Sequence, residues 1–463
     1  MQKKYWKILT ISIIITITLS SILSNARYIL DEKNKNLVSN QSSIVSGYID
    51  TIDGIKILHI NGSFYNMGFQ HGLLLKYECL ENIRAFLYYA EELGYSYNDL
   101  IDIWNKMKDF IPQDYINEMK GLADGIGVSF EKIGAVYVVL DSLGIVNCFG
   151  ISAWGPSTKS SKLIHARSCD LPFDFKDPVT GKYAHENNVL IIRNPDNGFA
   201  SLIPSVAVLM NLGGGINEKG IGYGAHLSWS NDQTFNGMPI TIRNQIVLDK
   251  SSASNEAIDI LKEDKTLGFN YVISDSKVPS GFIVETTSNL TYVGSWNDTN
   301  ESISPFWSID HVVRRTNFFI NPELAETQRN RYNLGGIIGY LKLNLYAVKS
   351  LLIKDNSIYD PDKMFPIWRN YRTMSREIQK QWGMLDMENI ISMLHNVYNG
   401  KTDILLFILL KMGEKLDLGS LESWNQWAAC PETGDMSVSF STRNEYASEN
   451  SEHNFNLYEL LDK

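Results

Sequence analysis

The feature that most limits how this chain can fold is a change of character at Cys148. Residues 148–300 consist of short β-type runs separated by glycine and asparagine turns. Before this block, and again from about residue 333 to 416, apolar residues recur at helical spacing. Helices on both sides of many antiparallel strands predict a layered α+β architecture. No internal repeat and no domain linker after residue 50 is visible in the sequence.

The local patterns predict individual elements within this frame. We expect helices over 64–92 and 115–123, another from Ser129 onward, and one over 255–262 that is capped by Ser254. The expected strands cover 54–60, 163–166, 189–193, 205–212, 221–227 and 282–285, with a closing strand pair in 428–441. Residues 27–50 are polar and predict a flexible linker.

Composition excludes several classes of protein. Of the 463 residues, 44% are apolar and 20% charged, which is typical of a folded globular protein. The formal net charge is −10 and no Lys/Arg cluster follows the first seven residues, so we expect no nucleic-acid partner. The sequence contains neither CxxC nor HExxH, so we predict no metal and no cofactor.

The N-terminus has the three-part layout of a secretory signal peptide. Lys3, Lys4 and Lys7 precede an apolar stretch over 8–23, and small residues follow up to Ala26. We therefore expect residues 1–26 to be a signal peptide; the alternative is an uncleaved membrane anchor formed by residues 8–23. A cleaved signal peptide predicts a secreted or lumenal protein, lysosome-like or extracellular, whereas an uncleaved one predicts a protein anchored in the membrane. Glycosylation sequons support export, at Asn40, Asn61, Asn289, Asn297 and Asn300.

A candidate for nucleophilic chemistry lies at the start of the β-rich block. Cys148 begins a predicted strand, a glycine/proline turn follows, and a return strand carries Arg167 and Asp170. A cation beside a thiol lowers the pKa of the thiol and favours the nucleophilic thiolate. The alternative is that Cys148 is a buried structural cysteine, as most free cysteines are.

Five motifs occur in an order that resembles one family. They are Gly62–Gly72 (GSFYNMGFQHG), Gly121–Val128 (GLADGIGV), Cys148 with the Arg167-x-x-Asp170 return strand, Asn217–Gly220 (NEKG) and Gly268–Tyr271 (GFNY). Together they resemble the cysteine N-terminal-nucleophile (Ntn) hydrolases of the isopenicillin-N acyltransferase type (acyl-CoA:6-aminopenicillanic acid acyltransferase). Wider relatives of that family include acid ceramidase, N-acylethanolamine amidase and choloylglycine hydrolases. The resemblance implies a four-layer αββα sandwich.

The resemblance also implies self-cleavage between Asn147 and Cys148. A chain of residues 27–147 and a catalytic chain of residues 148–463, with a helical insertion at about 333–425, would then remain associated. Cys148 would attack the substrate amide, and its freed α-amine would take the thiol proton. In this reading Arg167 and Asp170 hold the new N-terminus and the substrate, and Asn270 stabilises the oxyanion through its side-chain amide.

Two departures from the family pattern concern this site. Phe149 follows the nucleophile where a small hydroxylated residue is usual, and the return strand reads Arg-Ser-Cys-Asp instead of Arg-Asn-x-Asp. Four residues are secondary candidates for substrate binding, and each has a structural alternative. Asn211 and His226 could instead be structural hydrogen-bonding residues. Arg315 and Arg331 could instead be ordinary surface residues. Trp154 and Trp229 suit an apolar acyl pocket but also a plain core.

The function predicted from these residues is an amidase. It would hydrolyse a non-peptide amide bond of a small N-acyl compound, such as a lipid amide, through a thioester. The alternatives are an acyltransferase on the same scaffold, a phospholipase-like esterase, and a non-catalytic secreted binding protein that retains the fold.

Overall fold

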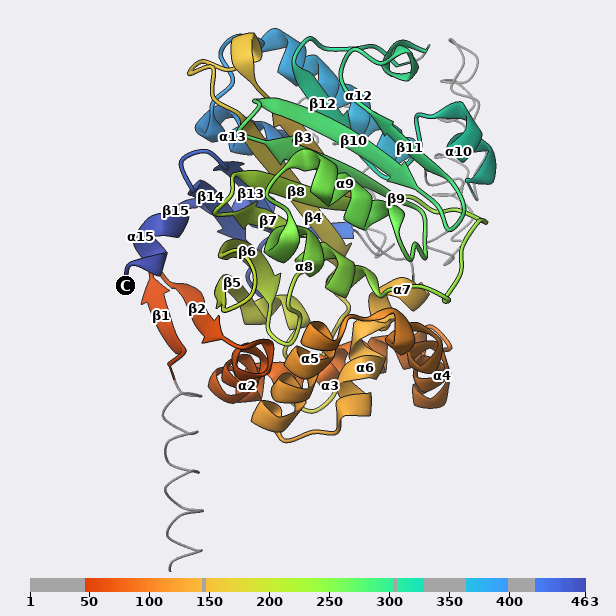
Figure 1. Cartoon of the computed structure of the whole chain (residues 1–463), viewed down its shortest axis with the longest axis vertical. Coiled ribbons are helices and arrows are strands. Elements are labelled where there is room, and N and C mark those ends of the chain that lie inside the picture. Colours follow the sequence, from red (N-terminus) through yellow and green to blue (C-terminus); the bar gives the residue numbers. More distant parts are fainter. Residues whose placement is uncertain (1–45, 144–146, 304–305, 329–363, 399–420) are drawn as a thin grey trace, which may run out of the picture. The chain divides into compact units, whose positions relative to one another are not determined.

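Two β-sheets lie at the centre of the chain (Figure 1). The structure is a computed structural model that describes residues 46–143, 147–303, 306–328, 364–398 and 421–463. The predicted signal peptide, the alternative anchor and the sequon at Asn40 lie outside the described residues, so export stays a prediction. Within the described ranges, no helix is both long enough and apolar enough to cross a membrane.

The larger sheet has nine strands in the order β1-β2-β5-β6-β7-β8-β9-β10-β11. All neighbours are antiparallel except β2 and β5, which run parallel. The parallel pair joins a strand that precedes Cys148 to one that follows it. The strands are β1 (Tyr48–Ile52), β2 (Ile55–Gly62), β5 (Asn188–Pro195), β6 (Ser201–Val206), β7 (Gly214–Asn217), β8 (Ile221–Leu227), β9 (Phe269–Asp275), β10 (Ser280–Thr286) and β11 (Thr291–Gly294).

The smaller sheet has six antiparallel strands in the order β12-β3-β4-β13-β14-β15. The expected closing strand pair is confirmed as β13 and β14. The strands are β3 (Asn147–Ala153), β4 (Ile164–Pro172), β12 (Val312–Arg315), β13 (Leu421–Cys430), β14 (Asp435–Phe440) and β15 (His453–Asn456).

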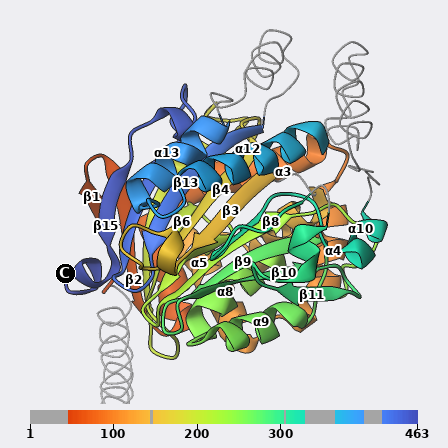
Figure 2. The same ribbon diagram turned by 90° about the horizontal axis from the view of Figure 1, so that it is seen from above.

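The two sheets face each other between two helical layers (Figure 2). Helices α8 (Ile240–Lys250) and α9 (Ser254–Lys262) cover the outer face of the nine-stranded sheet. Helices α12 (Met364–Lys380) and α13 (Met387–Tyr398) cover the outer face of the six-stranded sheet. The predicted α+β, four-layer αββα architecture is confirmed. The described helices of the expected insertion therefore form one of the four layers.

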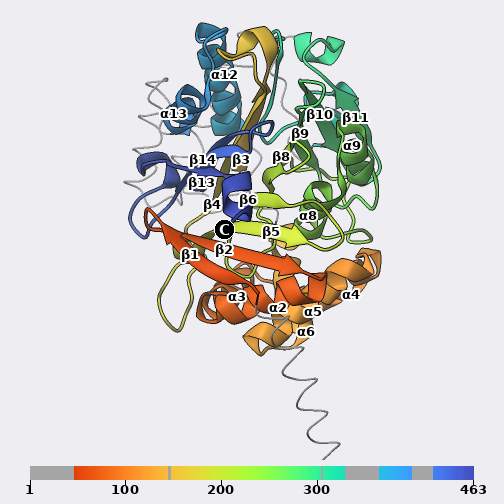
Figure 3. The ribbon, with the colours of Figure 1, turned by 60° about the vertical axis from the view of Figure 1, so that its left-hand side comes forward.

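The helices that precede Cys148 form a separate group below strands β2 and β5 (Figure 3). They are α2 (Phe64–Leu74), α3 (Lys76–Glu92), α4 (Tyr97–Met107), α5 (Gln113–Ile126), α6 (Phe130–Tyr137) and α7 (Val139–Leu143). Two short helices lie further along the chain, α10 (Pro322–Thr327) and α15 (Leu457–Leu461).

Two of the glycine-containing motifs, Gly62–Gly72 and Gly121–Val128, lie in this helical group, where their glycines allow close helix packing. Gly68 and Gly72 of α2 face Gly121 and Gly125 of α5, and a Cβ atom on any of the four would overlap backbone atoms of the opposite helix. Because glycine lacks a Cβ, the two helix backbones can touch. These motifs are therefore needed for helix packing and do not contribute reactive groups.

Several local predictions were wrong. Residues 48–50 belong to β1 instead of a flexible linker, and Ser254 is the first residue of α9, whose N-cap Ala253 makes no side-chain cap bond. The expected strand over 205–212 ends at Val206 because Val208 adopts a φ of +79°, which turns the chain. The N–H of Val208 is bonded to His71, 3.2 Å away, so His71 packs against this turn.

Candidate active site

Cys148 lies in β3, the second residue of that strand, directly opposite Cys169 of β4. Gly150 is opposite Arg167 in the same register. Since side chains alternate along a strand, Cys148, Cys169 and Arg167 share one face of the sheet. The strand–turn–strand arrangement predicted from the sequence is confirmed, and it brings the thiol and the guanidinium together.

Arg167 contacts the sulfur of Cys148 directly. Its Nη2 lies 3.1 Å from Cys148 Sγ, and its Nε donates to the carbonyl of Ala225 in β8, also at 3.1 Å. The second contact crosses from one sheet to the other and fixes the guanidinium. Arg167 is 3% exposed and Cys148 1% exposed, so the contact is shielded from water.

The two thiols titrate as a pair. Burial raises the pKa of the Cys148 thiol, its hydrogen bond with Cys169 adds to this shift, and Arg167 opposes it. The pKa of the Cys169 thiol is lowered, chiefly by the same hydrogen bond, with Arg167 contributing. A single negative charge on this pair of sulfurs is therefore stabilised beside the guanidinium.

The backbone nitrogen of Cys148 is held by Asn317, a residue that sequence reasoning missed. Cys148 N–H donates to Asn317 Oδ1 at 2.9 Å, and Asn317 Nδ2 donates to the carbonyl of Leu227 at 2.7 Å. The only sequence signal was a polar residue directly after β12, in Thr316-Asn317-Phe318. This contact spans 169 positions of the chain, so no local pattern could reveal it.

Asn270, predicted as the oxyanion donor, holds the loop after β12 in this structure. Its Nδ2 donates to the carbonyls of Thr316 (2.8 Å) and Phe318 (2.7 Å), on either side of Asn317. Both amide hydrogens are therefore used to hold the loop that carries Asn317. Its assignment as the oxyanion donor stays a prediction.

Asp170 is buried next to this site but on the opposite face of β4 from Arg167. It lies opposite Asn147 in the register, and its Oδ1 accepts a hydrogen bond from Ser168 Oγ at 2.5 Å. Burial raises the pKa of Asp170 well above its usual range, although the bond from Ser168 opposes this shift. Its predicted role in holding a new N-terminus stays a prediction.

Arg315, a candidate for binding a substrate carboxylate, is engaged with carboxylates of the protein itself. It is fully buried and pairs with two glutamates: Nε donates to Glu285 at 2.8 Å, and Nη2 donates to Glu301 at 2.5 Å. Glu285 also accepts the backbone N–H groups of Ile320 and Asn321. This closed ion cluster stabilises the loop after β12. Arg331 lies outside the described residues.

The remaining candidates support the site from a distance. Asn211 Oδ1 accepts the N–H groups of Gly213 (2.7 Å) and Gly214 (2.8 Å), so it shapes a turn. His226 lies against Gly150, where a Cβ atom would overlap its ring, and its Nδ1 contacts the carbonyl of Asn270 at 3.2 Å. Burial and then Arg167 lower the pKa of His226 well below its usual value, so the ring is neutral. The structural alternative holds for both residues.

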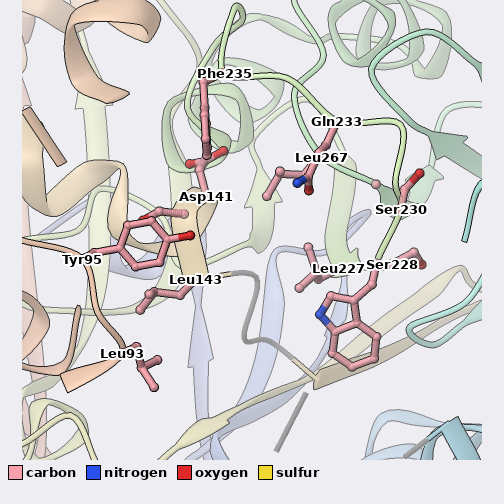
Figure 4. A pocket seen from close by; sticks show the side chains of 13 residues that line it. Leu93, Tyr95, Asp141, Leu143, Leu227, Ser228, Ser230, Gln233, Phe235 and Leu267 are labelled. Atoms are coloured by element: carbon pink, nitrogen blue, oxygen red, sulfur yellow. The ribbon is translucent and has the colours of Figure 1, made fainter. Parts of the chain in front are cut away.

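A cavity of about 300 Å³ adjoins Leu227 at the end of β8 (Figure 4), and Cys148, Arg167 and Asn317 are not among the residues that line it. Leu227, whose carbonyl binds Asn317, forms part of its wall together with Asp141 and Leu143, which shortly precede Cys148. Its apolar walls come from Leu93, Tyr95, Leu143, Leu227, Trp229, Phe235 and Leu267. Trp154, in contrast, packs in a core cluster with Leu163 and Val313. In the described ranges, no three His, Cys, Asp or Glu side chains gather to hold a metal ion.

Two facing sheets between helical layers, with a cysteine at the start of an inner strand, define the class of fold: a four-layer αββα protein. Residues 176–333 match the family model of the acyl-coenzyme A:6-aminopenicillanic acid acyl-transferases. The resemblance predicted from the motifs is therefore confirmed, over a segment that includes β8 to β12 and Asn317.

Curated relatives are distant. Protein dcd1B of Dictyostelium discoideum is 24% identical over 238 residues, 45% of this chain and 46% of the relative. An uncharacterized protein of Archaeoglobus fulgidus is 22% identical over 430 residues, 82% of this chain and 65% of the relative. Each alignment thus spans less than two thirds of the relative's own length.

Solved structures with similar folds include a conjugated bile acid hydrolase of Clostridium perfringens, with 16% identity and a TM-score of 0.33 over 67% of this chain and 96% of that one. Another is the Caenorhabditis elegans orthologue of N-acylethanolamine-hydrolyzing acid amidase, with 11% identity and a TM-score of 0.34 over 67% and 99%.

Proposed function

We propose that this protein is a cysteine amidase that cleaves its own chain before Cys148 and then hydrolyses the amide bond of a small N-acyl compound. The observation that carries the proposal is the environment of one residue: Arg167 binds the sulfur of Cys148 while Asn317 binds its nitrogen. After cleavage, a thiol and an amine on one residue, each held by a separate partner, would form a nucleophile and its base. The family match supports acyl-transfer chemistry of this kind.

Self-cleavage would begin with attack of the Cys148 sulfur on the Asn147 carbonyl carbon. The C–N bond breaks as a thioester forms, and the nitrogen of Cys148 gains a proton to become an amine. Water then hydrolyses the thioester and leaves Asn147 with a free carboxylate. The ordinary pKa of an α-amine is about 8, so a modest downward shift keeps it neutral near pH 7.

Turnover of a substrate would repeat this chemistry with an external amide. The amine accepts the thiol proton, the sulfur attacks the carbonyl, and the leaving amine takes the proton. Asn317 holds the Cys148 nitrogen throughout, because its Oδ1 can accept from an amide or from an amine.

The cavity beside Leu227 is the proposed site for the acyl group. Its walls combine apolar side chains with polar ones such as Asp141 and Gln233, and its volume is at the small end of the usual range for ligand pockets. An acyl chain of moderate length would bury its methylene groups there, and burial contributes about 0.8 kcal/mol for each group. The amide carbonyl would then lie toward Asn317.

The two chains would remain associated after cleavage. Strand β2, before the cut, is hydrogen-bonded to β5, after it. Arg193 of β5 also pairs with Glu118 of α5 and with Asp249 of α8, and all three are buried. A sheet pairing and a buried ion cluster that both cross the cut would keep the chains together. Co-elution of both fragments in gel filtration tests this expectation.

The first test of the function is the mass of the purified protein. We expect fragments that separate between residues 147 and 148, and we expect a single uncut chain from Cys148→Ala. Cys430→Ser is the matched control and should cleave normally, because Cys430 is buried in β13, outside the sulfur pair. An uncut wild-type chain that still turns over an amide would contradict the proposed mechanism.

The second test separates the alternatives. Matched amide and ester substrates with the same acyl chain are incubated with and without an acceptor amine. Release of free acid from the amide supports the amidase, whereas acylation of the added amine indicates an acyltransferase. Cleavage of the ester alone would favour an esterase, and binding without turnover would favour a non-catalytic binding protein.

A further inference from the structure

The cysteine opposite the proposed nucleophile has no role in the reaction described above. Cys169 occupies the variable position of the Arg-x-x-Asp segment, directly across the strand pair from Cys148. Both side chains are buried, at 0% and 1% exposure, and the Cys169 thiol lies 4.0 Å from the carbonyl of Leu212. Neither forms a disulfide in this structure.

The geometry of the strand pair suits a bond between these sulfurs. Cys148 N–H donates to Asn317 and not across to Cys169, so the two residues form a non-hydrogen-bonded pair of the antiparallel ladder. In such pairs the side chains come closest and the Cα atoms are about 4.5 Å apart. Disulfides require Cα separations of about 4.4–6.8 Å, so the bond can form with little backbone movement.

The electrostatics make one sulfur reactive toward oxidants. Arg167 lies 3.1 Å from Cys148 Sγ and favours a thiolate in the pair. Thiolates react with peroxides to give sulfenic acids, which either condense with a neighbouring thiol or oxidise further and irreversibly. The other two cysteines do not share this environment: Cys79 is on α3, and Cys430 ends β13.

We propose that Cys148 and Cys169 form a reversible disulfide that closes the active site under oxidising conditions and protects the nucleophile from irreversible oxidation. The oxidant is a peroxide, and the reductant is a thiol. The effect on activity rests on the proposed function, since it requires that Cys148 be the nucleophile. Formation of the disulfide itself does not depend on the proposed function.

Oxidation takes two steps. The thiolate of the Cys148–Cys169 pair attacks hydrogen peroxide; an S–O bond forms, the O–O bond breaks, and one water leaves after protonation, which gives a sulfenic acid. The other sulfur of the pair then attacks the sulfenic sulfur; the S–S bond forms, the S–O bond breaks, and a second water leaves with the thiol proton. A dithiol reverses the modification by thiol–disulfide exchange and becomes a disulfide itself.

The experiment uses the purified full chain treated with a small excess of hydrogen peroxide. Peptide mapping by mass spectrometry without reduction should show the peptides of Cys148 and Cys169 linked, with the loss of two hydrogens. Amidase activity should fall at least tenfold and return to most of its starting value after dithiothreitol. Cys430→Ser, as the matched control, should behave like wild type in both measurements.

The variants Cys169→Ala and Cys169→Ser test the protective role. Each is compared with its own untreated rate, so any change in basal activity does not affect the readout. We expect peroxide to inactivate both, with little recovery after dithiothreitol and with sulfinic acid at Cys148. Full recovery in both variants, or free Cys169 in oxidised wild-type protein, would overturn the proposal.

The two proposals can fail separately. A linked pair in a protein without amidase activity would leave the disulfide standing and remove the proposed function. An active amidase that accumulates oxidised Cys148 without the Cys148–Cys169 disulfide would support the proposed function and remove the disulfide proposal. The mass measurement decides the first point and the activity measurement the second.

Discussion

Two buried arginines flank the same glycine, and they have opposite surroundings. In the smaller sheet, Gly150 of β3 is opposite Arg167 of β4 on one side and Arg315 of β12 on the other. Arg315 is neutralised by Glu285 and Glu301. In the part of the chain that the structure describes, Arg167 pairs with no carboxylate and contacts a sulfur and a carbonyl oxygen instead.

The difference shows how a buried charge acquires a function. When a guanidinium is paired with carboxylates, their negative charges cancel its positive charge. It then stabilises the structure and attracts other anions only weakly. A guanidinium that lacks such a partner favours any negative charge formed beside it. In this molecule the group beside it is a thiol, so the same residue type is structural on one side of Gly150 and suited to catalysis on the other.

The largest expected effect is on stability and comes from Arg315→Met. It leaves two buried carboxylates without their cation, and breaking a buried pair in this way typically costs about 3–5 kcal/mol. The measurement is urea unfolding in a Cys148→Ala background, where the chain stays intact. Arg315→Lys serves as the conservative control and should lose less. A loss below about 1 kcal/mol would show that the cluster contributes little.

Arg167→Gln should show the reverse pattern. We expect the free energy of unfolding to be unchanged or higher, since no buried carboxylate loses its partner. Self-cleavage and amidase rates should fall roughly hundredfold, the size typical of removing one donor that stabilises developing charge. The pH dependence of alkylation by iodoacetamide should show a raised pKa for the sulfur pair. Arg167→Lys, which keeps the charge, should fall less; equal loss in both variants would mean that shape matters more than charge.

Asn270→Ala tests how the loop between the two arginine sites is held. It leaves the carbonyls of Thr316 and Phe318 without their donor, and each buried group left unsatisfied costs about 1–3 kcal/mol. We expect lower stability and a slower reaction, because Asn317 is no longer held in position. If Asn270 were the oxyanion donor, activity would fall without a loss of stability. Comparison with Asn317→Ala, measured by unfolding and by kcat, separates the two roles.

The last expected effect concerns Asp141, a buried acidic group whose stability contribution depends on pH. Burial raises the pKa of this carboxyl to about 7, against an ordinary value of about 3.9. Between these values the folded chain retains a proton that the unfolded chain has released, so stability falls as pH rises from about 4 to 7. Asp141→Asn does not titrate. Its stability relative to wild type should therefore increase across that window in thermal unfolding at matched pH, and a constant difference would contradict this assignment.

Local sequence was informative where the partners are close along the chain. Cys148 and Arg167 are separated by 19 positions and one turn, so the pattern of two short β runs sufficed to predict their contact. The glycine motifs before Cys148 were found for the same reason, although their role in packing α2 against α5 became clear only in three dimensions. Strand ends were harder, as Val208 shows, because a bond from its N–H to the distant His71 holds the turn.

By itself, the sequence determined the class of this protein: the layered α+β architecture, the cysteine at the start of an inner strand, and the arginine on the strand beside it. Only the tertiary structure decided which asparagine holds Cys148, which of the two arginines remains available for a thiolate, and that Cys169 lies against the nucleophile's sulfur. The physical reason is that periodicity and turns record interactions between near neighbours. Whether a buried charge is paired depends instead on strands and loops that are more than a hundred residues away along the chain.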